Sequence, residues 1–153
     1  MYPTVLTIHS WLRWATLFLA VAATLNAFRR DTDVSQRMPG RHWDSLFMMA
    51  LDFQVLFGLL LYFGLSPFTR EALNDLGAAL SNPGLRFWAI EHIGMMVAAV
   101  ALVRAGRVLA LTATTASARR TRRALFFTLT TLVILGGIPW PGLENGRPLW
   151  RSF

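Results

Sequence analysis

Three histidines, His9, His42 and His92, are the residues of this 153-residue chain best suited to bind a metal, because the chain has no cysteine. Without cysteine there is no thiolate metal site, no disulfide, no cysteine nucleophile and no covalent c-type haem attachment. His9 and His92 lie inside long apolar blocks, and neutral imidazole is a good ligand for iron. His42 lies beside Arg41 between two blocks and is expected to be a solvated surface residue. The first and third histidines therefore point to an iron site in apolar surroundings.

Membrane-spanning helices are the elements expected to position this pair. Hydrophobic residues make up 54% of the chain and charged residues 15%. The apolar residues gather in four blocks, 5–28, 44–65, 87–103 and 124–140, each close to the ~20 residues that a helix needs to cross the hydrocarbon layer. We expect a single all-α domain over residues 1–153, an integral membrane four-helix bundle with up-down-up-down topology.

The net charge of +7 comes with basic residues that are all arginine, and these lie mainly in the connectors between apolar blocks. Ten lie in the first and third connectors, against four in the second connector and the tail. Connectors rich in basic residues stay on the cytoplasmic side, so both termini are predicted to face outward. Nucleic-acid binding is not expected. The ten arginines are Arg29, Arg30, Arg37, Arg41, Arg104, Arg107, Arg119, Arg120, Arg122 and Arg123.

The second connector, residues 66–84, predicts a short amphipathic helix on the outer surface. Pro67 and Thr69 are helix-start signals, leucines follow at helical spacing, and Asn82-Pro83-Gly84 ends the pattern. This helix could lie in the headgroup region or cover a pocket at the outer end of the bundle.

The two apolar histidines are predicted to lie at the same depth. His9 is about four residues into the first helix and His92 about five or six into the third, roughly 6–9 Å below the outer end at ~1.5 Å per residue. The first and third helices of such a bundle are diagonal neighbours. With adjacent axes ~8–10 Å apart, the diagonal of roughly 12–14 Å leaves room for one planar macrocycle with an imidazole on each side. A b-type haem with two histidine ligands needs this arrangement.

The surroundings of the pair also suit a haem, whose two propionates need cationic partners near water. Glu91 is a candidate to support the ligand His92 or to pair with Arg13, which lies one turn below His9. Methionine on a buried helix is more often packing than ligand. The candidate propionate partners are Arg13, Arg86, Arg147 and Arg151, and Gly94, Met95, Met96 and Ala99 are expected along the pocket.

Polar residues within the spans have a simpler interpretation as well. Intramembrane histidine, glutamine and aspartate can act as hydrogen-bonding links between helices. Asp52 and Gln54 lie near the middle of the second helix, too deep for propionates. The Asp52 carboxyl could pair with Arg13, stay protonated, or relay a proton to a quinone. Tyr62 is a further possible donor in the pocket.

Four sequence segments stand out as a set, and they are Ile8-His9-Ser10-Trp11-Leu12-Arg13-Trp14, Gln54 through Gly58 to Tyr62, Leu85-Arg86-Phe87-Trp88-Ala89-Ile90-Glu91-His92, and Gly137-Ile138-Pro139-Trp140-Pro141. Together they resemble small four-helix bacterial membrane proteins labelled cytochrome b or cytochrome b-like. The resemblance covers nearly the whole chain, and its most specific pieces are Arg86 to His92 and the Ile-Pro-Trp-Pro ending. It implies a bacterial inner-membrane electron-transfer protein with non-covalent haem b, with His9 and His92 as ligands.

The expected function is therefore single-electron transfer by one haem b, with quinone or within a larger redox complex, rather than catalysis by a stand-alone enzyme. The sequence offers no serine–histidine–acid arrangement, phosphate-binding glycine loop or zinc-ligand spacing. Two alternatives stay open. One is a structural or assembly subunit of a respiratory or photosynthetic complex without its own haem. The other is a small transporter or proton channel that uses Arg13, Asp52 and Glu91.

Overall fold

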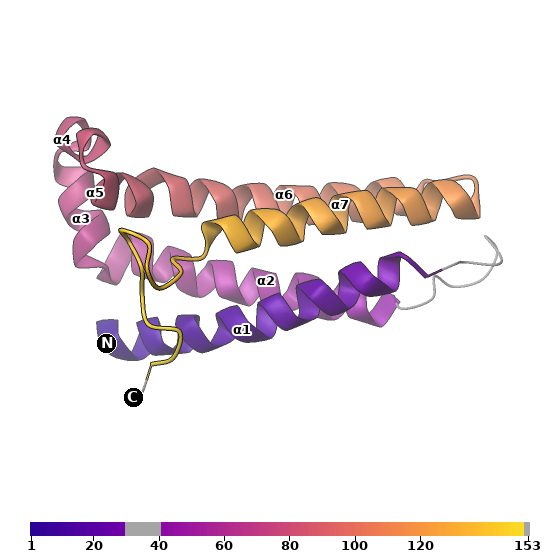
Figure 1. Cartoon of the computed structure of the whole chain (residues 1–153), viewed down its shortest axis with the longest axis horizontal. Helices are drawn as coiled ribbons and strands as arrows, with labels where there is room; N and C mark the ends of the chain where they lie inside the picture. The colour runs from indigo at the N-terminus through magenta and orange to yellow at the C-terminus, as the bar shows by residue number, and fades with distance from the viewer. Residues whose placement is uncertain (30–40, 152–153) are drawn as a thin grey trace.

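The computed structural model describes residues 1–29 and 41–151, and within them every regular element is helical. Four long helices lie side by side along the long axis (Figure 1). They are α1 (Tyr2–Ala27), α2 (Arg41–Leu60), α6 (His92–Leu111) and α7 (Ala116–Gly137). Five short elements connect α2 to α6: η1 (Leu61–Leu65), α3 (Pro67–Asn74), α4 (Leu76–Ser81), α5 (Pro83–Arg86) and η2 (Phe87–Glu91), of which η1 and η2 are π-helical. Arg30 and Arg37 of the predicted first connector lie outside the described residues.

Each long helix has its most extensive packing against two of the other long helices. Helix α1 contacts α2 and α7, and α6 contacts α7 and α2, so α1 and α6 lie at opposite corners, as predicted for the first and third apolar blocks. Helices α6 and α7 approach each other closely at Gly106, where an added Cβ would collide with Phe126. The shared core is built largely from small residues and a few large ones: Ala20, Ala23, Ala27, Phe47, Leu51, Ala99, Val103, Ala124, Phe127, Ile134 and Ile138.

Three helical stretches of the described chain are long and apolar enough to cross a membrane, namely Tyr2–Ala27, Arg41–Leu65 and Pro83–Leu111. Helix α7 is not among them, since its first two turns hold four of the connector arginines. Its apolar part, residues 124–137, is about 21 Å long, shorter than the ~30 Å hydrocarbon layer. The structure thus supports three of the four predicted spans.

The helices that contain the last two apolar blocks have bounds that differ from those of the blocks. Helix α6 continues past Val103 to Leu111, because Arg104 and Arg107 are accommodated by ion pairs with α2 rather than ending the helix. Helix α7 begins at Ala116, where the Thr115 side chain caps it by accepting a hydrogen bond from the Ala118 amide. It ends at Gly137 instead of residue 140, because the residue before a proline is biased to extended backbone.

The connector between the second and third spans forms three short helices instead of one. Its start is as predicted, with Ser66 as the cap of α3 and Pro67 in the first turn. Asp75 then breaks the helix by adopting a non-helical backbone conformation and accepting a hydrogen bond from the Ala78 amide, which starts α4. Asn82 caps α5 in the same way. Short polar side chains that compete for backbone amides favour such breaks.

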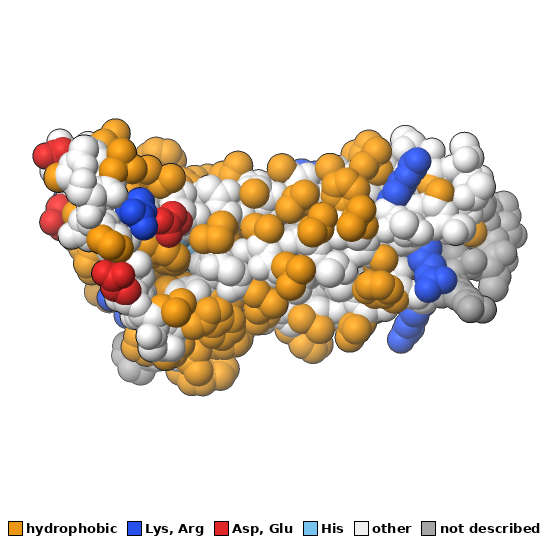
Figure 2. All heavy atoms as spheres, turned by 45° about the horizontal axis from the view of Figure 1, so that its top comes forward, with side chains coloured by type: hydrophobic (Ala, Val, Ile, Leu, Met, Phe, Trp, Pro, Cys, Tyr) orange, Lys and Arg blue, Asp and Glu red, His pale blue; other side chains and the backbone are white. Residues whose placement is uncertain are grey.

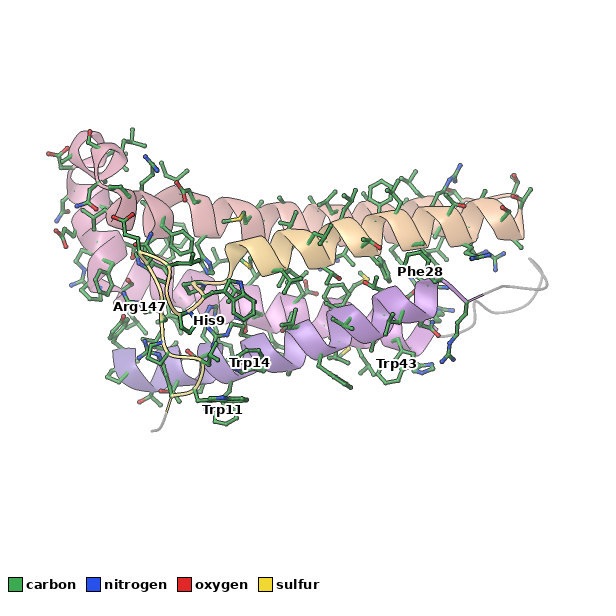
Figure 3. The ribbon with its side chains drawn as sticks, in the orientation of Figure 1. His9, Trp11, Trp14, Phe28, Trp43 and Arg147 are labelled. Carbon is green, nitrogen blue, oxygen red and sulfur yellow. The ribbon has the colours of Figure 1, made fainter. Side chains whose placement is uncertain are left out.

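The two ends of the molecule differ in charge, as Figure 2 shows, with hydrophobic side chains covering the middle. The end that carries α3–α5 and both described termini holds the acidic side chains seen in this view (Figures 1 and 2). It contains His9 (Figure 3), and His92 lies beside His9. We call it the histidine end. The opposite end carries the α6–α7 turn and the arginines at the start of α7, and we call it the arginine end.

At the arginine end, Asp44 of α2 is fully buried and holds three helices together. One carboxylate oxygen accepts a hydrogen bond from Arg107 of α6 and the other from Arg123 of α7, each at 2.9 Å. The Arg123 side chain is itself 1% exposed. A buried charge persists in a protein only where it is paired in this way.

Candidate cofactor site

A cavity with an empty volume of about 1000 Å³, including the part open to the surroundings, lies at the histidine end. Its walls come from α1, α2, η1, α3, η2, α6, the end of α7 and the C-terminal tail. The first turn of α3 contributes Phe68 and Thr69, so the connector covers a pocket, one of its two predicted roles. Its polar and aromatic lining residues include His9, Arg13, Gln54, Tyr62, Phe68, Trp88, His92, Arg147 and Arg151.

The structure brings His9 and His92 together at this cavity. Their ring centroids are 6.3 Å apart, with an angle of 74° between the ring planes. His92 opens α6 directly after the π-helical segment η2, and such one-turn distortions are frequent at functional sites. The two imidazoles therefore lie at the same level of the bundle.

His92 is held in one orientation by the end of α7. Its Nδ1 lies 2.8 Å from the carbonyl oxygen of Gly137, and because a carbonyl only accepts, Nδ1 is the donor. The lone pair is then on Nε2. A metal-binding histidine typically donates its other ring N–H to a carbonyl or carboxylate in this way. An added Cβ on Gly137 would lie 2.5 Å from Met96 Cε, so glycine permits this close approach of α7 to α6.

His9 is held more loosely, against α2. Its Nε2 lies 3.3 Å from the Gln54 side-chain nitrogen, and its Nδ1 is buried without a hydrogen-bond partner among the described residues. Gln54 Oε1 is buried without a partner there as well. Gly58 leaves space for the ring, because a Cβ at this position would lie 3.2 Å from His9 Cε1. Unpaired buried polar atoms are rare in native proteins and mark this contact as incomplete.

Three arginines line the same cavity. Arg13 donates a 2.8 Å hydrogen bond from Nη2 to the Leu149 carbonyl, which leaves its remaining N–H groups for other acceptors. Arg147 stacks over two rings, with Cζ 4.7 Å from the centroid of Phe68 and 5.2 Å from that of Trp88. Arg151 is the third lining cation. Guanidinium groups in such positions suit carboxylate ligands.

The C-terminal tail crosses the histidine end from α7 to α1 (Figures 1 and 3). The indole N–H of Trp14 donates to the Leu149 carbonyl at 2.9 Å, and that of Trp11 donates to the Arg151 carbonyl at 3.0 Å. Trp150 stacks on Trp14 with centroids 5.2 Å apart. The tail therefore presents Arg147 and Arg151 to the cavity through contacts made with α1.

Several predicted site residues lie elsewhere. Arg86 and Glu91 form a 2.7 Å ion pair with each other, and both side chains are more than 40% exposed. Asp52 pairs with Arg104 at 2.6 Å, so the suggested pairings of Arg13 with Asp52 or Glu91 were wrong. Met96 does line the cavity. Three residues expected along the pocket are outside its lining: Gly94 is exposed, Met95 packs against the α7 glycines, and Ala99 belongs to the core.

Sequence reasoning missed the residues that lock the cavity wall. Tyr62 was expected as a possible donor in the pocket, and it does line the cavity. Its hydroxyl donates to the Ala89 carbonyl at 2.8 Å and ties η1 to η2, a partner that was not predicted. Thr69 then donates to the Tyr62 carbonyl at 2.8 Å. Gly137 was noted only within the family resemblance, although a Gly-Gly pair before Ile-Pro is a usable signal for a close helix end. Nothing local in the sequence indicates the partners of Tyr62 and Thr69.

The histidine ligands available at this site are the imidazoles of His9 and His92. The described residues contain no group of three or more histidine, aspartate or glutamate side chains that could hold a metal. Two imidazoles supply only two of the ligands that a metal needs. The remaining ligands would have to come with the metal, as they do in a metallated macrocycle. The chain matches no family model, no curated protein and no solved structure.

Proposed function

We propose that this chain binds one haem b between His9 and His92 and transfers single electrons in a membrane. The observation that carries the proposal is the pair of imidazoles facing one cavity at 6.3 Å. The two imidazoles would hold the haem iron, each through one ring nitrogen. The arginines at the cavity supply partners for two carboxylates.

Each residue has a defined task in this proposal. His92 offers Nε2 while Gly137 fixes its ring. His9 becomes a ligand when the Gln54 amide gives way, and the 3.3 Å contact between them is long for a hydrogen bond. Arg13, Arg147 and Arg151 hold the propionates, and the apolar walls exclude water. When bound, the haem iron supplies the one-electron redox chemistry.

We further propose that α7 is the fourth span of an up-down-up-down bundle in a bacterial inner membrane, with both termini on the periplasmic side. The apolar part of α7 is short, but the buried Ile138-Pro139 segment that follows it in extended backbone adds to its apolar length. Arginines lie at the starts of α2 and α7 and near the end of α6, and this clustering favours a cytoplasmic location for the arginine end.

A reduced-minus-oxidised absorption spectrum of the detergent-purified protein, expressed with haem precursor, tests the haem. We expect a sharp low-spin b-type α-band that His9→Ala and His92→Ala each abolish or convert to high spin. His42→Ala is the matched control, because His42 is exposed at the arginine end, and its spectrum should be unchanged. Added imidazole should restore the low-spin band of His92→Gly. A colourless wild type would contradict the proposal and favour a structural subunit without its own haem.

The absence of cysteine makes the topology easy to test. Ser81→Cys on α4 and Thr114→Cys in the α6–α7 turn place one exposed thiol at each end of the molecule. With a membrane-impermeant maleimide on spheroplasts, we expect labelling of the Ser81→Cys variant only. Labelling of Thr114→Cys instead would reverse the proposed orientation.

A further inference from the structure

We propose that the chain forms a two-fold symmetric dimer in the membrane through the face shared by α2 and α6, centred on the ion pair of Asp52 with Arg104. This inference rests on the proposal that α2 and α6 cross a membrane, and it is independent of the haem. The two side chains are joined at 2.6 and 2.8 Å, and each remains 50% exposed.

The position of this ion pair is unusual for a surface that faces lipid. Asp52 is 11 residues from Arg41 and 13 from Leu65, so it lies near the middle of the span. Its exposed neighbours on α2 are apolar, with Met49 at 56% and Phe53 at 52%. Ionisable groups at this depth are costly in hydrocarbon and normally face protein or a water-filled cavity. The two charges lie outside the cavity lining. Contact with a second protein chain would therefore shield them from lipid.

The neighbouring face of α6 permits close approach by another helix. Exposed small residues follow one another along α6 within about 60° of its circumference, and they are Gly94, Ala98, Ala101 and Ala105. Small residues at such spacing let helix backbones approach closely in membranes. Packing within the chain explains Gly106, but a Cβ on Gly94 would meet nothing within 4 Å. The open side of Gly94 is thus free for a partner.

The charges themselves favour a second copy as that partner. One face that carries both an acid and a base side by side is complementary to itself under two-fold rotation. Two copies then form a cluster of four charges with alternating signs, removed from lipid. A helix of another protein would need its own matched pair at the same depth.

Disulfide cross-linking in native membranes tests the dimer, because the chain has no cysteine of its own. Ala101→Cys places a thiol on the proposed face. Leu132→Cys is the matched control at similar depth on α7, as the contacts of Gly106 with Phe126 and of Met96 with Gly137 indicate. We expect at least fivefold more cross-linked dimer from Ala101→Cys. Equal cross-linking of the two variants, or a monomer in nanodiscs, would overturn the proposal.

Charge variants in the Ala101→Cys background test the role of the ion pair. Asp52→Arg and Arg104→Asp should each reduce homodimer cross-linking at least fivefold, and co-expression of the two should restore a heterodimer. Gly94→Leu should block cross-linking as well, although its side chain meets open space within the protomer. Retention of each variant in carbonate-washed membranes shows that it is inserted. Unchanged cross-linking in all three variants would overturn the proposal, whereas wild type released by carbonate would contradict the membrane placement instead.

Discussion

At the arginine end, Asp44 is fully buried and each of its oxygens accepts a hydrogen bond from a different arginine. At the histidine end, His9 Nδ1 and Gln54 Oε1 are buried without partners among the described residues, beside an open cavity. Both ends place polar groups among apolar helices, but only at the arginine end are the buried charges paired with each other, although Arg123 Nε there has no hydrogen-bond partner among the described residues. Satisfied networks rigidify a fold, whereas unsatisfied groups next to a cavity indicate a place for a ligand. This difference assigns structure to the arginine end and binding to the histidine end.

The largest expected effect comes from removing the acid of the arginine end. Asp44→Ala leaves Arg107 and Arg123 without their counter-charge, and Arg123 is almost completely buried. Breaking a buried ion pair from one side costs about 3–5 kcal/mol of unfolding free energy. Unfolding in mixed detergent micelles, followed by circular dichroism, measures this loss.

The triple variant Asp44→Leu/Arg107→Met/Arg123→Met is the control for that interpretation. Replacing the whole network with apolar residues should recover most of the stability, because no uncompensated charge remains. If Asp44→Ala lowers the unfolding free energy by less than about 1 kcal/mol, the two ends do not differ as proposed.

A smaller effect is expected where α7 closes on His92. Gly137→Ala places a methyl group 2.5 Å from Met96 Cε and 3.3 Å from Met95 Cβ. Met96 Cε is the end of a flexible side chain and can move aside, so the cost should lie in the lower part of the about 1–3 kcal/mol typical of overpacking. The tight contact with Met95 Cβ should displace the carbonyl that orients His92. We expect a broadened or partly high-spin haem spectrum together with the loss in stability. Gly136→Ala is the control, because its nearest contact is the Met95 sulfur at 3.8 Å. An unchanged spectrum in Gly137→Ala would show that the carbonyl does not position the ligand.

The next largest effect is expected at Gln54, which competes with the proposed haem iron for His9. Gln54→Leu removes the 3.3 Å contact to Nε2 and an unpartnered buried oxygen. Because a hydrogen bond contributes about 0.5–1.5 kcal/mol, haem should bind up to about tenfold more tightly. Titration of the haem-free protein measures the affinity. Asp52→Asn on the same helix faces away from the cavity and should leave it unchanged. Weaker binding in Gln54→Leu would mean that Gln54 supports the site.

The sequence predicted the paired histidines and the helical fold because depth and apolar length follow from counting residues. It could not predict which helix-to-helix ion pairs form. Arg104 was predicted to lie in a connector, whereas its side chain forms an ion pair with Asp52. The sequence also did not indicate that Asp44 is buried and bonded to Arg123. Such pairs depend on the rotation and register of whole helices, which one chain's local pattern does not encode. The expected single helix at residues 66–84 was wrong for a different reason, since the cap at Asp75 overrode the leucine spacing.

The smallest expected effect concerns the tail that brings two arginines to the cavity. Trp14→Phe removes the hydrogen bond to Leu149 and part of the stacking with Trp150, but Arg13 still donates to the same carbonyl. The loss should be about 1 kcal/mol, which raises amide hydrogen exchange of residues 143–151 roughly fivefold. Trp43→Phe at the arginine end removes an indole of the same kind (Figure 3) and should leave exchange in the tail unchanged. If both variants loosen the tail equally, the two ends are coupled through the long helices, and the division between a structural end and a binding end no longer holds.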